Sequence, residues 1–131
     1  ENLDFLNKCV NIKKLTINLG LGSEKSQSQR NIDALKYLTK LEKLSIAGLP
    51  DSDGNFSYAG LSYCKKLKNL EIGADSSTNV LANLKSCSEL EELNLLSNGE
   101  FNIKLNTSNF YGIKKFDKLK KVDLDNATFK F

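Results

Sequence analysis

The stretch LKSCSELEELNL, residues 84–95, places apolar residues at spacings of three, three, three and two. A spacing of three keeps Leu84, Cys87 and Leu90 on one face of a helix or helical turn. The final step of two, from Leu93 to Leu95, is the side-chain period of a strand. The stretch therefore predicts a helical segment that leads directly into a short extended segment.

The same five-position frame occurs five times along the chain. Its copies are Leu6, Cys9, Ile12, Leu15, Ile17; Leu35, Leu38, Leu41, Leu44, Ile46; Leu61, Cys64, Leu67, Leu70, Ile72; Leu84, Cys87, Leu90, Leu93, Leu95; and Ile113, Phe116, Leu119, Val122, Leu124. All 25 positions are apolar against a background of 40%. Successive fourth positions lie 29, 26, 23 and 29 residues apart. The chain is therefore an array of internal repeats.

One helix–strand unit cannot bury its apolar face alone, whereas stacked units form a continuous core. The sequence therefore predicts an α/β solenoid of five repeats in a single domain, residues 1–131. A short parallel β-sheet is expected on the concave face, with helices on the convex face. The approximate repeat boundaries are 3–30, 31–57, 58–80, 81–109 and 110–131. No polar capping unit is recognisable at either end, so we expect a fragment of a longer solenoid.

The stretches 61–72 and 84–95 resemble leucine-rich repeats, in particular the cysteine-containing and ribonuclease-inhibitor-like subtypes. The resemblance covers nearly the whole chain and implies a segment of a horseshoe. That family usually has Asn or Cys three residues after the last strand leucine. Asn98 holds this position in the fourth copy, but the others have Gly20, Leu49, Asp75 and Ala127. The loops that follow the strands are therefore expected to vary.

The amino-acid composition argues against several classes of function. Histidine is absent, which excludes Ser/His and Cys/His nucleophilic pairs and most zinc sites. The 18 lysines and one arginine alternate with acidic residues, a pattern that does not favour nucleic acid. No apolar run is long enough to span a membrane. We therefore expect no enzyme, no nucleic-acid partner and no membrane segment.

Cofactor and disulfide signals are also lacking. Cys9, Cys64 and Cys87 all occupy the second frame position, where a small buried hydrophobe fits, so no disulfides are expected. Free thiols favour a cytoplasmic or nuclear location. The segment Asp51-Ser-Asp53-Gly-Asn55 is better explained as a turn than as a calcium loop, because Gly54 comes too early. No cofactor or metal is expected.

If the frame is right, the residues between the strand apolars project onto the concave face in three columns. The first column is Lys14, Lys43, Asn69, Glu92 and Lys121. The second is Thr16, Ser45, Glu71, Asn94 and Asp123. The third is Asn18, Ala47, Gly73, Leu96 and Asp125. The polar members of these columns are the predicted partner-binding residues. Carboxylates concentrate in the later copies, which favours a basic partner segment there.

The expected function is a protein–protein interaction scaffold that binds another protein on the concave face. A structural subunit of a larger assembly is an alternative. Another is the recognition arm of a multidomain protein, such as a ubiquitin-ligase substrate receptor or a microbial surface or effector protein. An enzyme would need a cluster of perturbed titratable groups in a pocket, and the sequence offers no candidate. The sequence does not identify the partner.

Overall fold

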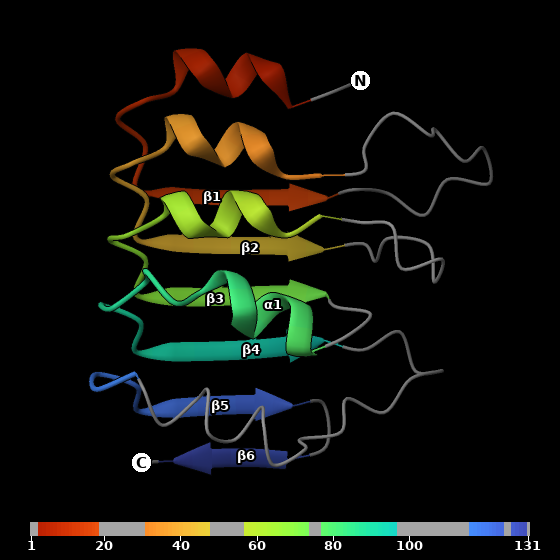
Figure 1. Ribbon diagram of the computed structural model, residues 1–131, viewed down its shortest axis with the longest axis vertical. Helices are drawn as coiled ribbons and strands as arrows, with labels where there is room; N and C mark the ends of the chain where they lie inside the picture. The colour runs from red at the N-terminus through yellow and green to blue at the C-terminus, as the bar shows by residue number, and fades with distance from the viewer. Residues whose placement is uncertain are drawn as a thin grey trace, which may run out of the picture.

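The computed structural model describes residues 3–18, 31–47, 57–73, 77–96, 116–124 and 127–130. Helical segments alternate with strands along the chain (Figure 1). The elements are η1 (Asp4–Lys8), β1 (Lys14–Asn18), η2 (Asp33–Tyr37), β2 (Lys43–Ala47), η3 (Ala59–Tyr63), β3 (Asn69–Gly73), α1 (Ser77–Asn83), β4 (Glu92–Leu96), β5 (Lys121–Leu124) and β6 (Ala127–Lys130). The helical segments cover one face of the sheet.

Within the described residues, three of the four helical segments are 3₁₀ helices, and the frame explains why. A 3₁₀ helix has three residues per turn, the spacing of the apolar positions. In the second copy the amides of Leu35, Leu38 and Leu41 donate to the carbonyls of Ile32, Leu35 and Leu38 at 3.0, 2.9 and 3.1 Å. Each frame residue thus closes a tight turn onto the frame residue before it. The predicted helical segments are confirmed for the first four copies, mostly of the tighter type, whereas the start of the fifth copy lies outside the described residues.

Strands β1 to β5 form a parallel sheet in sequence order. The register aligns the fourth frame positions with one another, as in Leu44↔Leu70 and Leu70↔Leu93. It also aligns the fifth positions, as in Ile46↔Ile72. The predicted parallel sheet is therefore confirmed, and the spacing of the frame sets its register.

The core lies between the sheet and the helical segments. All five frame residues are at most 3% exposed in the second, third and fourth copies. In the first copy Cys9, Ile12 and Leu15 are only partly buried, because β1 pairs with one described strand rather than two. Burial of a leucine side chain contributes about 1.5–3 kcal/mol, so the middle of the sheet is its most stable part.

The structure adds a core position that the five-position frame lacks. Ile32, Tyr58 and Leu81 precede the first frame position by three residues and are 0%, 2% and 7% exposed. Their carbonyls accept the first turn hydrogen bonds, from Leu35, Leu61 and Leu84 in that order, at 3.0–3.2 Å. In these three copies the apolar frame therefore starts one turn before the predicted first position.

Strand β6 is a second difference from the prediction. It pairs antiparallel with β5 through Leu124↔Ala127 and Val122↔Phe129. Only Asp125 and Asn126 separate the two strands, which is the length of a tight hairpin loop. The edge of β5 that does not face β4 is therefore covered by β6, although no capping unit was predicted from the sequence.

Two further expectations concern parts of the chain outside the described residues: the first frame position of the fifth copy, Ile113, and the loops after the strands. Within the described part, no helix is long and apolar enough to cross a membrane.

Candidate functional site

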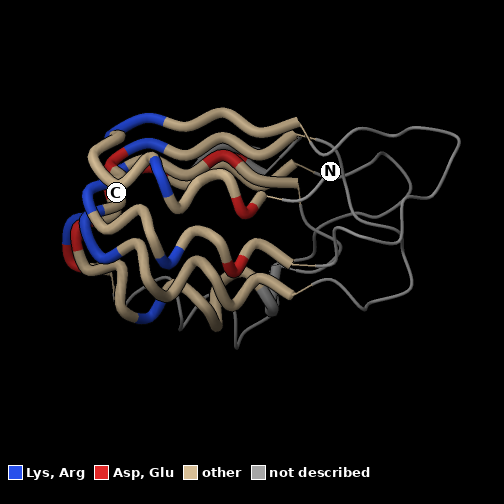
Figure 2. Tube along the Cα trace, turned by 90° about the horizontal axis from the view of Figure 1, so that it is seen from above, with Lys and Arg blue, Asp and Glu red and all other residues tan. Residues whose placement is uncertain are grey.

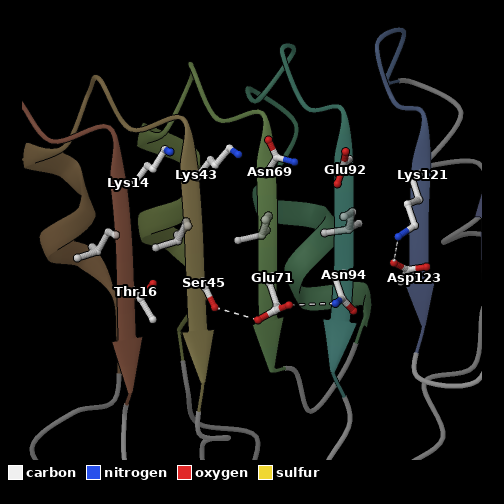
Figure 3. Close-up of a pocket in the computed structure, with 14 residues that line it drawn as sticks. Lys14, Thr16, Lys43, Ser45, Asn69, Glu71, Glu92, Asn94, Lys121 and Asp123 are labelled. Atoms are coloured by element: carbon white, nitrogen blue, oxygen red, sulfur yellow. Dashed lines mark hydrogen bonds and ion pairs between the residues drawn. The ribbon is translucent and has the colours of Figure 1, made fainter.

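The face of the sheet opposite the helical segments is hollowed. The hollow has a volume of about 470 Å³ and is lined by residues of β1 to β5. Figure 3 shows the labelled side chains pointing out of this face, with the helical segments behind the sheet. Strand leucines such as Leu44 and Leu70 also line the hollow, but their side chains are buried on the other face. They line it through the main chain, because side chains alternate along a strand.

Two ladders of polar side chains cross the hollow, in the order that the frame predicts. The first ladder pairs Lys14↔Lys43, Lys43↔Asn69, Asn69↔Glu92 and Glu92↔Lys121. The second pairs Thr16↔Ser45, Ser45↔Glu71, Glu71↔Asn94 and Asn94↔Asp123. Neighbouring strands lie about 4.8 Å apart, so each ladder is a closely spaced row of functional groups.

Glu71 is held at the centre of the second ladder by its neighbours on both sides. Ser45 Oγ donates to Glu71 Oε1 at 2.9 Å, and Asn94 Nδ2 donates to Glu71 Oε2 at 3.1 Å (Figure 3). Both carboxylate oxygens therefore have a fixed direction, while the side chain remains exposed. Each oxygen can accept a further hydrogen bond from a ligand.

The charges of the hollow are divided by strand. Lys14 and Lys43 on β1 and β2 are exposed and form no ion pair with any described residue. Glu71 and Glu92 on β3 and β4 are exposed and acidic. The hollow is therefore positive towards β1 and negative in the middle.

On β5 a lysine and an aspartate of the hollow form an ion pair. Lys121 Nζ lies 2.6 Å from Asp123 Oδ2, two residues along the same strand (Figure 3). The hydrogen bond and charge of Asp123 raise the pKa of Lys121 above its usual value, and the carboxylate of Glu92 adds to this. The predicted run of carboxylates in the later copies is thus partly neutralised. The three predicted columns did not predict this ion pair between Lys121 and Asp123 of the same strand.

The third predicted column lies at the ends of the strands. Asn18 aligns with Ala47, and Gly73 aligns with Leu96. None of these four residues lines the hollow. Asp125, the last predicted member, lies outside the described residues.

The three cysteines lie on the helical side, away from the hollow, and all are free thiols, as predicted. Cys64 and Cys87 are buried, and Cys87 Sγ donates to the carbonyl of Leu61 at 3.4 Å. Burial raises the pKa of Cys64 to about 12 and that of Cys87 to about 11. These thiols are therefore neutral, unreactive core residues at physiological pH.

The described residues contain no group of three or more His, Cys, Asp or Glu side chains arranged to hold a metal ion. The lysines and carboxylates of the hollow can offer charge and hydrogen bonds to a ligand at several fixed points. The hollow is therefore chemically suited to bind a ligand that contacts several of these charged groups along the two ladders.

Comparison of the sequence with models of protein families finds no match, and comparison with curated proteins finds none either.

Proposed function

We propose that this chain is a segment of a leucine-rich-repeat solenoid that binds a partner protein on the hollowed face of its sheet. The proposal rests on the frame, on the parallel sheet that follows from it, and on the hollow. An extended row of polar groups on a rigid scaffold can bind with little loss of conformational entropy. We expect an extended segment of the partner to bind along this row of polar groups.

The single observation that carries the proposal is the fixed carboxylate of Glu71 within the hollow. Its two oxygens are oriented by Ser45 and Asn94 from the strands on either side. Surface carboxylates are usually mobile, and ordering one in advance lowers the entropy cost when a ligand binds. An exposed and oriented acceptor at the centre of a hollow is what a recognition surface needs.

Binding explains the hollow better than catalysis does. A catalytic acid or base needs a perturbed pKa in a site that excludes water. The largest pKa shifts among the described residues belong to Cys64 and Cys87, which are buried on the opposite side of the sheet. The raised pKa of Lys121 comes from its ion pair with Asp123 and keeps the lysine charged. A charged, paired lysine is suited to contact and is not a general base.

The test is a selection of peptides from a displayed random library on the immobilised chain, followed by affinity measurements on synthetic copies of the enriched peptides. The hollow variant carries Glu71→Lys and Glu92→Lys, two exposed sites on the lining. The matched control carries Asp33→Lys and Asp117→Lys, two exposed sites outside the lining. Both variants change the net charge by the same amount, and circular dichroism checks that both fold.

We expect the enriched peptides to bind the control as they bind the wild type and to bind the hollow variant at least tenfold more weakly. Equal binding to all three proteins would contradict the proposal, because the peptides would then contact another surface. A selection that enriches no peptide would also count against it.

A further inference from the structure

A second charged surface lies at the edge of the sheet where the strands begin, and the proposed function does not use it. Figure 2 shows Lys, Asp and Glu residues gathered at this edge. The edge is formed by the turns that join each helical segment to its strand. The turns stack directly on one another, because Glu42 N donates to the carbonyl of Lys13 and Lys68 N to the carbonyl of Glu42, both at 2.8 Å.

The first three of these turns, residues 9–13, 38–42 and 64–68, are here called the basic turns. They hold five lysines and one acidic residue, Glu42. The lysines are all exposed, and they are Lys13, Lys40, Lys65, Lys66 and Lys68. Lys14 and Lys43 follow immediately at the starts of β1 and β2, so the positive charge continues towards the hollow.

In the next two turns, residues 87–91 and 116–120, lysines form ion pairs with glutamates. Lys118 Nζ lies 2.7 Å from Glu89 Oε2, and Lys120 Nζ lies 3.5 Å from Glu91 Oε2. Glu89 occupies the turn position that Lys66 and Lys40 hold in the basic turns. The fold therefore accommodates ion pairs between stacked turns, and among the described residues these pairs lie at one end of the edge.

Lys13, Lys65 and Lys66 form no ion pair with any described residue. At the neighbouring turn position Glu42 stacks between Lys13 and Lys68, but Lys40 and Lys66 are like charges on adjacent turns, and Lys40 Nζ donates to Asn11 Oδ1 at 2.8 Å. One acidic residue among five lysines leaves the basic turns with a net positive charge. This excess of exposed positive charge is complementary to an acidic ligand.

We propose that the basic turns bind an acidic segment of a partner protein. This surface is distinct from the hollow and does not depend on the proposed function. Three stacked turns cover two spacings of about 4.8 Å, close to 10 Å in all. An extended chain advances about 3.3 Å per residue, so a run of about four acidic residues matches the surface.

A protein partner fits these turns better than a nucleic acid does. Base stacking needs aromatic or guanidinium planes among the positive charges. The basic turns contain neither aromatic residues nor arginine. Flexible ammonium groups are well suited to carboxylates on an equally flexible segment.

The experiment measures fluorescence anisotropy of labelled synthetic peptides at 50 mM salt. The peptides carry two, four or eight consecutive Glu residues in a Gly/Ser frame, and a fourth carries Gln in place of Glu. The test variant is Lys13→Gln, Lys65→Gln and Lys66→Gln. The matched control is Lys8→Gln, Lys85→Gln and Lys130→Gln, which removes the same charge from exposed sites outside the basic turns. Circular dichroism confirms that both fold, and Lys40→Gln with Lys68→Gln gives a second test variant.

The wild type is expected to bind the four-Glu peptide, to gain little from eight, and to ignore the Gln peptide. Each test variant should weaken binding of the four-Glu peptide by about tenfold, and the control by less than threefold. Equal weakening by the test and control variants would overturn the proposal, since binding would then reflect net charge alone. No binding by the wild type would also overturn it. Tighter binding of a twelve-nucleotide single strand that depends on the same lysines would replace the acidic peptide with a nucleic acid.

Discussion

Gly60 allows the second and third helical segments to pack closely, and replacing it with alanine tests that packing. A Cβ atom at position 60 would lie 1.9 Å from the carbonyl oxygen of Ile32 and 2.6 Å from its carbonyl carbon. Both contacts are to backbone, so no side-chain rotation can relieve them. The same oxygen accepts the hydrogen bond from Leu35 N at 3.0 Å that begins η2.

The cost of Gly60→Ala follows from these contacts. Overpacking of this kind costs about 1–3 kcal/mol. Displacement of the Ile32 carbonyl weakens a hydrogen bond with a net value of about 1 kcal/mol. We therefore expect the free energy of unfolding to fall by about 2–4 kcal/mol. Domains are stable by only about 5–15 kcal/mol, so the loss is large.

The assay is urea denaturation followed by far-ultraviolet circular dichroism. With a slope of about 2 kcal/mol per molar urea, the midpoint should fall by roughly 1–2 M while the slope stays the same. The control is Ala59→Ser at the exposed neighbouring position, where a change below about 0.5 kcal/mol is expected. A Gly60→Ala variant as stable as the control would refute the close approach of η2 and η3.

Four further predictions concern the core and the turns. Leu67→Ala removes a fully buried side chain and should lower the free energy of unfolding by about 2–5 kcal/mol, measured by the same urea titration. Cys64 and Cys87 should resist iodoacetamide at pH 8 in the folded protein and react after unfolding, while the half-buried Cys9 reacts earlier. Because their pKa values are raised to about 12 and 11, the unfolded chain loses these protons first, so stability should fall as the pH rises above about 9. Glu89→Gln removes an exposed ion pair and should leave the urea midpoint unchanged at 0.15 M salt.

The frame was sufficient to predict the sheet because the strand period and the spacing between copies fix the register together. Once Leu44 and Leu70 occupy equivalent positions, a slip of one residue would turn both to the wrong face. The ladders through Ser45 and Glu71 follow from the same register. The stacking of those side chains was therefore predictable without any knowledge of the loops.

Other features depend on three-dimensional detail that the frame does not contain. The earlier core turn at Ile32 and Tyr58 was present in the sequence as one more step of three, but the loops before it obscured the repeat. Hydrogen bonds to Glu71 and the pair of Lys121 with Asp123 depend on side-chain rotamers, which column assignment does not specify. Strand β6 reverses direction and lies outside the frame altogether.

The most direct test of the proposed binding face is a titration of the ¹⁵N-labelled protein with the tightest peptide from the library selection, followed by amide chemical shifts. We expect the largest shifts on residues 14–17, 43–46, 69–72 and 92–95, in the strands that carry the two ladders. Shifts confined to η1, η2, η3 and α1, with the strand amides unchanged, would contradict it.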